Sequence, residues 1–305
     1  MEQREYIVEA EGAGQRIDRF LSGEDTGLSR SALQGLVAEG HVLCNGRAPA
    51  KSLKLKAGDI ILLEIPDAKP IEAVPQEIPL DIVYEDEDVV VINKKKGMVV
   101  HPAAGHYTGT LVNGLMHHCK DELSGINGVM RPGIVHRIDM DTTGVLIVCK
   151  NDFAHNSIAA QLKEHSITRK YRAIVYGVIK EDEGTVDAPI GRHPVDRKKM
   201  SINEKNGRRA VTHYRVLKRF SKYTYIECQL ETGRTHQIRV HMASIHHPLV
   251  GDTVYGPEKS PFHLQGQTLH AGVLGFIHPR TGEYMEFTAP LPQYFTELLQ
   301  KLENM

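Results

Sequence analysis

The sequence predicts an α+β protein with two domains, and three observations carry this prediction. Helix-type and strand-type segments come in separate runs along the 305 residues, which favours a mixed, largely antiparallel sheet. A short region with two helix signals, residues 14–65, precedes an acidic stretch with four prolines, residues 66–79. Strand signals then dominate residues 80–305. We therefore expect a small N-terminal α/β domain, a linker and a large sheet domain.

The composition is that of an ordinary soluble protein, with 41% hydrophobic residues, 25% charged residues and a formal net charge of −1. No apolar run reaches the roughly 18 residues that a membrane span needs, and the first residues lack a signal-peptide pattern. We expect a cytoplasmic protein with no membrane partner. The four cysteines are far apart and form no CxxC pair, so neither a disulfide framework nor a zinc site is indicated.

The N-terminal helices follow from their caps. Residues 1–13 are expected to form a tail, and residues 16–21 have the pattern of a first helix. Ser29 is placed to cap a second helix, which runs through Val37 and ends at Gly40.

Two short strands are expected after these helices. The apolar runs 41–44 and 60–64 have strand composition, and Asn45-Gly46 is a strong turn signal between them. Residues 66–79 are too rich in proline for regular structure and are expected to be an interdomain linker.

Six apolar runs predict strands in the large domain, and two capped segments predict helices. The expected strands are residues 81–84, 89–93, 145–148, 170–179, 211–217 and 223–230. The expected helices are residues 153–165, capped by Asp152, and 236–246, capped by Thr235.

The charges are unevenly distributed. Residues 191–219 carry ten Lys or Arg against Asp196 and Glu204, so this segment has a net charge of +8. Such a block is usually a solvated loop, but it also suits a nucleic-acid phosphate backbone.

A carboxylate at Asp139 is the first candidate for chemistry. It lies between Arg137 and the loop that ends at Gly144, directly before the buried run 145–148. The simple alternative is an Asx turn, in which the side chain only bonds its own backbone.

Two further segments supply partners for such an acid. Arg234 stands just ahead of a predicted helix, where it could pair with a carboxylate. Tyr171 enters a strand among three cations, Arg169, Lys170 and Arg172, a combination suited to stacking on a base while the cations hold phosphate. Taken singly, such an arginine is as often a solvated surface charge, and such a tyrosine is more often part of the core.

Together these segments resemble the RluA/RluD-type pseudouridine synthases over residues 80–295. The matching segments are Ile92 to Pro102, His136 to Gly144, Lys170-Tyr171, Gly233 to Arg239, His247 to Asp252, Tyr255-Gly256 and Leu269 to Ala271. Lys95 departs from a common proline, and Ile138 from a common leucine.

The resemblance implies that the protein converts uridine in RNA to pseudouridine. It implies that Asp139 is the nucleophile, that Arg234 is its ion-pair partner and that Tyr171 stacks on the target uracil. Arg137 is expected to assist base extrusion, and His136 and Lys170 to bind substrate. Neither a metal nor a cofactor is expected.

The N-terminal region resembles the S-four-type RNA-binding domain. The resemblance lies in Arg16 to Leu21, Leu28 to Leu33, Glu39 to Val42, Asn45-Gly46 and Leu55 to Asp59. It implies that four cations lie near an RNA phosphate face, namely Arg16, Arg30, Arg47 and Lys51.

This combination of domains resembles the large-subunit branch of the family, so 23S ribosomal RNA is the expected partner of a monomeric enzyme. Three alternatives stay open: a tRNA pseudouridine synthase, a non-catalytic RNA-binding or ribosome-assembly protein, and a hydrolase that uses Asp139 with Asp141. The last is disfavoured because residues two apart in a loop rarely oppose each other as acid and base.

Overall fold

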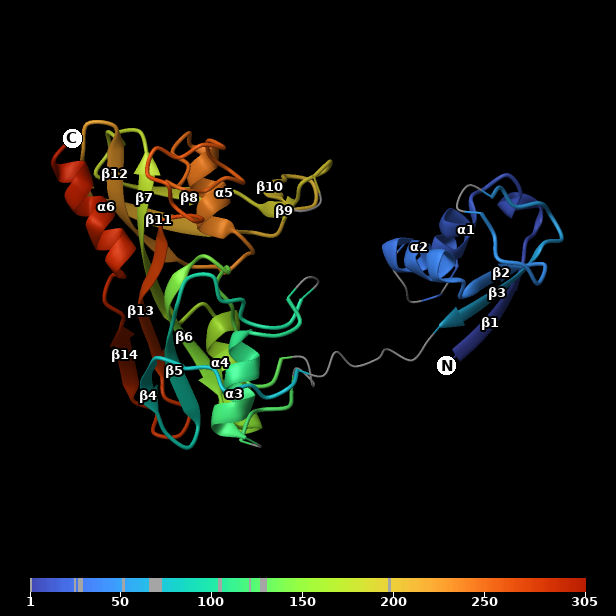
Figure 1. Ribbon diagram of the computed structural model, residues 1–305, viewed down its shortest axis with the longest axis horizontal. Coiled ribbons are helices and arrows are strands. Elements are labelled where there is room, and N and C mark those ends of the chain that lie inside the picture. The colour runs from blue at the N-terminus through green and yellow to red at the C-terminus, as the bar shows by residue number, and fades with distance from the viewer. Residues whose placement is uncertain are drawn as a thin grey trace. The chain divides into compact units, whose positions relative to one another are not determined.

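The computed structural model describes residues 2–24, 26, 30–50, 53–65, 73–103, 106–120, 122–126, 131–196 and 199–305. The chain divides into two compact units, Met1–Pro70 and Ile71–Met305 (Figure 1). Helices and largely antiparallel strands occur together, which confirms the predicted α+β class. Within the described ranges, the helices are all too short or too polar to cross a membrane.

The first unit is a three-stranded sheet with two helices packed on it. Strand order is β1-β3-β2, and the core includes Ile17, Leu21, Leu33 and Leu63. The bounds are β1 Glu2–Ile7, the 3-10 helix Ala10–Gly12, α1 Ile17–Gly23, α2 Arg30–Glu39, β2 Val42–Cys44 and β3 Ile60–Ile65.

The predicted tail of residues 1–13 is wrong, because residues 2–7 form β1 and pair antiparallel with β3. β1 is an edge strand, and several of its side chains are exposed. An edge strand tolerates the polar sequence that made this segment look like a tail. Asn45 and Gly46 both have positive φ, as the predicted hairpin turn requires.

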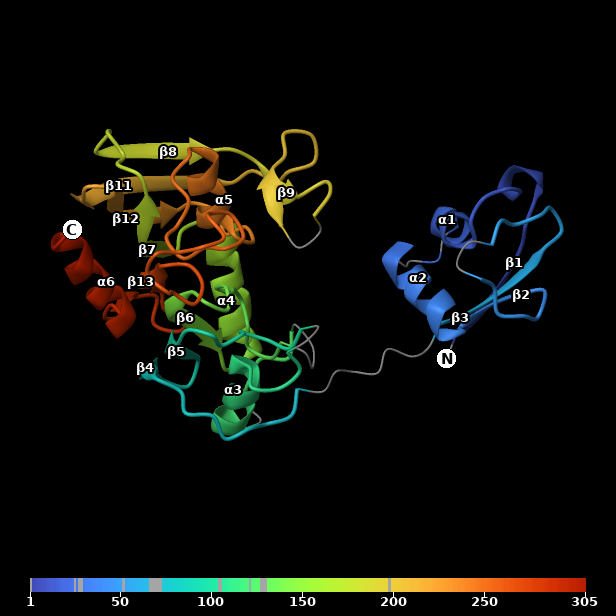
Figure 2. The same cartoon turned by 45° about the horizontal axis from the view of Figure 1, so that its top comes forward.

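The second unit is built on one nine-stranded sheet in the order β4-β5-β6-β13-β7-β12-β11-β8, with β14 paired to β13 (Figures 1 and 2). The β9–β10 hairpin lies outside this sheet, beside α5. The strands are β4 Ile82–Glu85, β5 Val89–Lys94, β6 Thr143–Cys149, β7 Thr168–Tyr176, β8 Glu183–Asp187, β9 Ile190–Arg192, β10 Met200–Ile202, β11 Val211–Arg219, β12 Tyr223–Leu230, β13 Leu269–Ile277 and β14 Tyr284–Thr288. The helices are α3 Leu111–Cys119, α4 Asp152–Lys163, α5 Gln237–Ser244 and α6 Gln293–Glu303.

Helices cover both faces of this sheet. α3 packs in one cluster with Leu146 and Val148 of β6, whereas α4 packs in another with Val145 and Ile147. Because side chains alternate along a strand, the two helices lie on opposite faces. All seven residues of β6 are buried, so the Asp139 loop that precedes it is fixed to the centre of the domain.

Gly144 belongs to β6 and not to the expected turn. Its φ is +109°, and a Cβ atom there would lie 2.1 Å from the carbonyl oxygen of Ala271 on β13. Glycine is needed because two backbones approach closely.

The linker prediction is wrong at its C-terminal end. Residues 66–72 lie outside the described part of the chain, but Ala73 is buried against the second unit. Gln76 donates its N–H to the carbonyl of Asn113 at 2.9 Å, and Asn113 donates in turn to the carbonyl of Val74 at 2.8 Å. Proline therefore marks an irregular segment here, but one that packs on α3.

The two caps predicted in the second unit are each displaced by one residue, and Ser29, the cap predicted in the first unit, lies outside the described residues. Asn151 caps α4 by accepting from Ala154 N, and Asp152 lies within the helix. The residue before α5 is His236, which adopts a left-handed conformation and provides no side-chain cap.

Candidate active site

A pocket of about 470 Å³ opens where three parts of the second unit meet. The loop before β6 forms one side, the start of β7 forms a second, and the segment that leads into α5 forms a third. The residues that matter below are Arg137, Asp139, Arg169, Tyr171, Arg234 and Arg239. A pocket of this size suits a small molecule or one extruded nucleotide base.

Asp139 is held by an ion pair with Arg239, whose Nη1 lies 3.0 Å from Asp139 Oδ2. The other side of the Arg239 guanidinium makes two hydrogen bonds to Asp252, at 2.6 and 3.0 Å. The Asp252 side chain has no exposed surface, and that of Arg239 is 7% exposed. Burial alone would lower the pKa of Arg239, but the hydrogen bonds and charge of Asp252, with the charge of Asp139, raise it above its ordinary value. This guanidinium is thus fixed and charged between two carboxylates.

The predicted ion pair between Asp139 and Arg234 is therefore wrong. Arg234 lines the pocket, but its Nε donates to the carbonyl of Arg209 at 3.0 Å. Arg239 stands five residues further on, inside α5, where Asp139 and Asp252 both reach it. A sequence signal existed: Arg239 interrupts the run of residues 238–242 that is otherwise suited to burial.

His236 lies beside the second oxygen of Asp139, with Nε2 3.8 Å from Oδ1. Its Nδ1 bonds the hydroxyl of Tyr255 at 2.8 Å, and that hydroxyl accepts from Met200 N. Burial lowers the pKa of His236, the charge of Asp139 opposes this and that of Arg239 adds to it. A neutral imidazole therefore faces the acid at neutral pH.

Tyr171 is in the pocket as expected, and it is 8% exposed. Burial raises the pKa of its hydroxyl, and the charge of Arg169 opposes the increase. Lys170 does not reach the pocket: it lines a different cavity with Glu183 and Gln229. Lys170 was predicted to bind substrate; side chains alternate along β7, which places Arg169 and not Lys170 in this pocket with Tyr171. Arg169 was missed, although the same alternation could have found it.

His136 and Arg137 both line the pocket, as expected for substrate-binding residues. His136 Nε2 accepts a hydrogen bond from Ile147 N at 3.0 Å, which ties the loop to β6. Burial and the charge of Arg169 lower the pKa of His136 to about 3, so its imidazole is neutral. Arg137 is exposed at the pocket wall.

Lys94 supports the Asp139 loop from beneath. Its buried ammonium group donates to the carbonyls of Lys95, Met98 and Met140, at 3.0, 2.8 and 2.9 Å. Since Met140 follows Asp139 directly, these bonds fix the backbone at the acid.

Two of the four cations expected to bind RNA, Arg16 and Arg47, have described side chains, and their contacts differ. Arg47 is exposed beside the hairpin turn, whereas Arg16 Nε donates to the buried Asp18 at 3.0 Å. Lys51 and the side chain of Arg30 lie outside the described residues.

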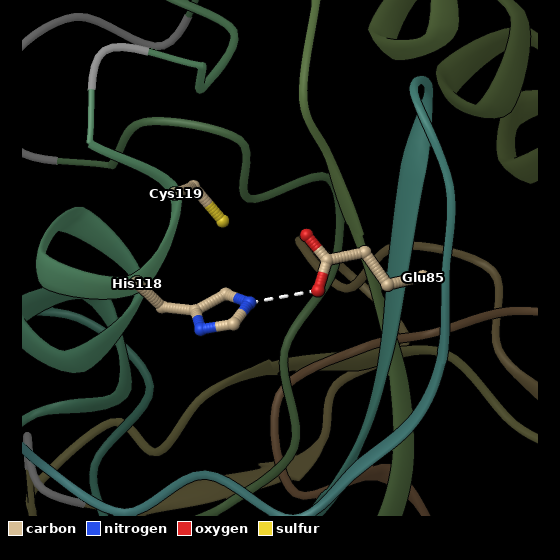
Figure 3. A group of neighbouring side chains, drawn as sticks. All are labelled: Glu85, His118 and Cys119. Atoms are coloured by element: carbon tan, nitrogen blue, oxygen red, sulfur yellow. Dashed lines mark hydrogen bonds and ion pairs between the residues drawn. The ribbon is translucent and has the colours of Figure 1, made fainter.

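Two groups in the described chain have the donor atoms of a metal site. In the first, Glu85, His118 and Cys119 lie together at the end of α3 (Figure 3). The ammonium group of Lys150 binds Glu85 Oε1 at 3.1 Å, and His118 binds the other oxygen at 2.7 Å. The second group is formed by Asp86, Asp88 and His278. Here Arg280 binds the carboxylate of Asp88 through two hydrogen bonds. A side-chain cation thus already neutralises a carboxylate in each group, which explains both without a metal.

A fixed carboxylate and an aromatic ring in a pocket of this size fit an enzyme that acts on a nucleotide base. A family model described as RNA pseudouridylate synthase matches residues 88–244, which include Asp139, Tyr171 and Arg239. The chain belongs to this family, and it is an isomerase that converts uridine in RNA to pseudouridine.

Relatives match along the whole chain. It is 54% identical over 304 residues to "Uncharacterized RNA pseudouridine synthase YlyB" of Bacillus subtilis (strain 168), covering 100% of this chain and 99% of the relative. It is 49% identical over 312 residues to "Ribosomal large subunit pseudouridine synthase D" of Zymomonas mobilis, covering 99% and 98%. Among solved structures, human RNA pseudouridylate synthase domain containing 1 matches with a TM-score of 0.57 and 25% identity, over 78% of this chain and 98% of the other.

Proposed function

We propose that this enzyme modifies uridine in the RNA of the large ribosomal subunit, with Asp139 as the nucleophile. The proposed target rests on the relatives named ribosomal large subunit pseudouridine synthase D, such as those of Zymomonas mobilis and Pseudomonas aeruginosa at 49% and 46% identity. The proposed chemistry rests on one observation, the Asp139 carboxylate held by Arg239 in a pocket of base size.

The isomerisation breaks the bond between uracil nitrogen 1 and ribose carbon 1′, turns the base and rejoins it through carbon 5. A fixed carboxylate can form the temporary bond that keeps sugar and base in place during this sequence. Arg239 orients Asp139 for this step, and Asp252 orients Arg239. Because the ion pair is already formed, little rearrangement is needed when the base enters.

Tyr171 and Arg137 handle the base in this proposal. Extrusion of a base costs a few kcal/mol of lost stacking, and an aromatic side chain returns about 1–3 kcal/mol per base. Tyr171 supplies that ring at the pocket wall, and Arg137 assists extrusion from the loop beside it. Arg234, with its guanidinium partly exposed at the rim, is placed for RNA phosphate and not for the acid.

We assign the first unit as an S-four-type RNA-binding domain. Of the four cations predicted to bind RNA, Arg47 is exposed beside the hairpin turn, where it is available to phosphate. The net charge of +8 in residues 191–219 gives the second unit a further basic segment, part of which forms the β9–β10 hairpin. We propose that the enzyme works as a cytoplasmic monomer, which gel filtration and fractionation of cells test.

The test of the chemistry is release of tritium from carbon 5 of uracil in large-subunit RNA. The wild type should release tritium, and Asp139→Asn should release none while it still binds the RNA. Release by the variant at the wild-type rate would refute the role of Asp139. Pseudouridine maps of RNA from cells with and without the gene identify the target. Loss of a site in tRNA alone would favour the tRNA alternative, and an unchanged map would favour a non-catalytic role.

A further inference from the structure

Arg169 is a buried cation in the pocket for which the mechanism above has no use. It is 6% exposed and lies two residues before Tyr171 on β7, so both side chains share one face of the strand. It lines the pocket.

Arg169 lacks the compensation that a buried charge normally has. Among the described residues, no carboxylate lies within 4.0 Å of its guanidinium, and its Nε has no hydrogen-bond partner. Nη2 donates only to the carbonyl of Glu231, at 3.2 Å. Burying an ion in this way costs several kcal/mol. The uncompensated burial of Arg169 therefore points to a functional role for its charge.

Glycine at position 233 makes room for this guanidinium. A Cβ atom there would lie 2.6 Å from Arg169 Nη1, closer than any real contact. The segment that leads to α5 therefore leaves space for the Arg169 guanidinium beside the pocket.

The reaction creates a negative charge on the uracil that a nearby cation can stabilise. When the bond between nitrogen 1 and carbon 1′ breaks, its electron pair stays on nitrogen 1, and the uracil leaves as an anion whose charge spreads to both carbonyl oxygens. Carbon 1′ receives a new electron pair from the Asp139 carboxylate. Carbon 5 later bonds to carbon 1′ as the bond from carbon 1′ to Asp139 breaks and its electron pair returns to the carboxylate. Carbon 5 then loses its proton, and nitrogen 1 regains one. In a closed pocket the intermediate anion needs a fixed counter-charge.

We propose that Arg169 is the counter-charge that stabilises the uracil anion. This inference rests on the proposed function. The other pocket cations are less suited. Arg239 is already neutralised by two carboxylates, Arg137 and Lys163 are exposed, and Arg234 is partly exposed at the rim. The field of Arg169 reaches its neighbours, since it contributes to the lowered pKa of His136.

The experiment compares Arg169→Met, Arg169→Lys and Lys170→Met in single-turnover tritium release from large-subunit RNA. Lys170 is the matched control, since it is the adjacent cation on the opposite face of β7. Arg169→Met should slow release about 100-fold, the effect of losing one electrostatic stabiliser, with an unchanged Kd for RNA. Arg169→Lys should recover most of the rate, and Lys170→Met should match the wild type. Equal losses in the Met and Lys variants, or a loss confined to Kd, would overturn the proposal.

A second substrate tests the anion itself. Fluorine at carbon 5 stabilises negative charge on the ring, so RNA with 5-fluorouridine should depend less on Arg169. The rate ratio of wild type to Arg169→Met, followed by the 19F signal of the starting nucleotide, should be smaller than with uridine. An equal or larger ratio contradicts the proposal. If the wild type fails to convert either RNA, the proposed function is at fault; if only the variants fail to differ, the role of Arg169 is.

Discussion

Two walls of the pocket each carry a buried arginine, and the two guanidinium groups differ in whether carboxylates neutralise them. On the α5 wall, Arg239 is bound by Asp139 and Asp252 and is neutralised by them. On the β7 wall, Arg169 is as deeply buried, and within the described chain no carboxylate lies near it. One charge holds the catalytic group in place, and the other is left uncompensated for a charge that exists only during the reaction. The stability of the fold therefore depends on Arg239 and is reduced by Arg169.

Removal of Arg239 should have the largest effect. Arg239→Met leaves Asp139 and Asp252 without a cation, which should cost about 3–5 kcal/mol of unfolding free energy. The rate of tritium release should fall on the order of 10⁴-fold, as when a group that orients a catalytic residue is lost. Urea unfolding and single-turnover release measure the two effects.

Arg234→Met is the matched control, because it removes an arginine from the same segment without touching the ion pair. At saturating RNA it should keep the fold and most of the rate. If the Met variant at 239 does not fold, Arg239→Lys keeps a charge without the two-pronged geometry and should fold with a reduced rate. A wild-type rate in either Arg239→Met or Arg239→Lys would contradict the role of Arg239 in holding Asp139.

Tyr171 tests how the β7 wall binds the base. Tyr171→Leu removes a ring whose stacking supplies about 1–3 kcal/mol, so the rate at limiting RNA should fall by about one to two orders of magnitude. Tyr171→Phe keeps the ring and should retain the stacking contribution. Equal losses in both variants would assign the effect to the hydroxyl instead.

Gly233→Ala should displace the Arg169 guanidinium without removing it. The new Cβ needs the space of Nη1, and the side-chain end is free to shift. We expect a loss of about 10-fold in rate, below the roughly 100-fold that a 1 Å misplacement can cost. In the Arg169→Met background the same change should have little further effect, whereas an additive loss would show that Gly233 acts on another group.

A further prediction concerns pH. The folded protein keeps His136 neutral down to a pKa of about 3, whereas an unfolded chain takes up the proton near about pH 6.5. The unfolded state therefore gains protons first, and the unfolding free energy should fall as the pH drops from about 6.5 toward 3. Urea unfolding across this range should show a shallower slope for His136→Gln. An unchanged slope would contradict the burial of a neutral His136.

Local patterns predicted much of the fold. Alternation and burial identified β5, β6 and β12 because each strand carries its own signal. The start of the chain was misjudged because an edge strand can be polar, and Gly144 was taken for a turn because its real constraint is the backbone of Ala271, far away in sequence. Tertiary contacts of this kind leave no local pattern.

The site residues also divide into those that local sequence predicted and those that tertiary contacts decide. Asp139 and Tyr171 were found from their own segments, and the structure places both in one pocket. The arginine that pairs with Asp139 was misassigned because helix phase and the position of Asp252 decide it. Arg169 was overlooked in favour of Lys170, although the period of two along a strand distinguishes them.

The unfolding free energy of Arg169→Met at pH 7 tests the contrast between the two walls most directly. An apolar side chain that replaces an uncompensated buried charge removes a desolvation cost of several kcal/mol. The account predicts a variant that is more stable than the wild type and slower in catalysis. A variant that is less stable than the wild type would contradict it, because Arg169 would then be a structural cation like Arg239.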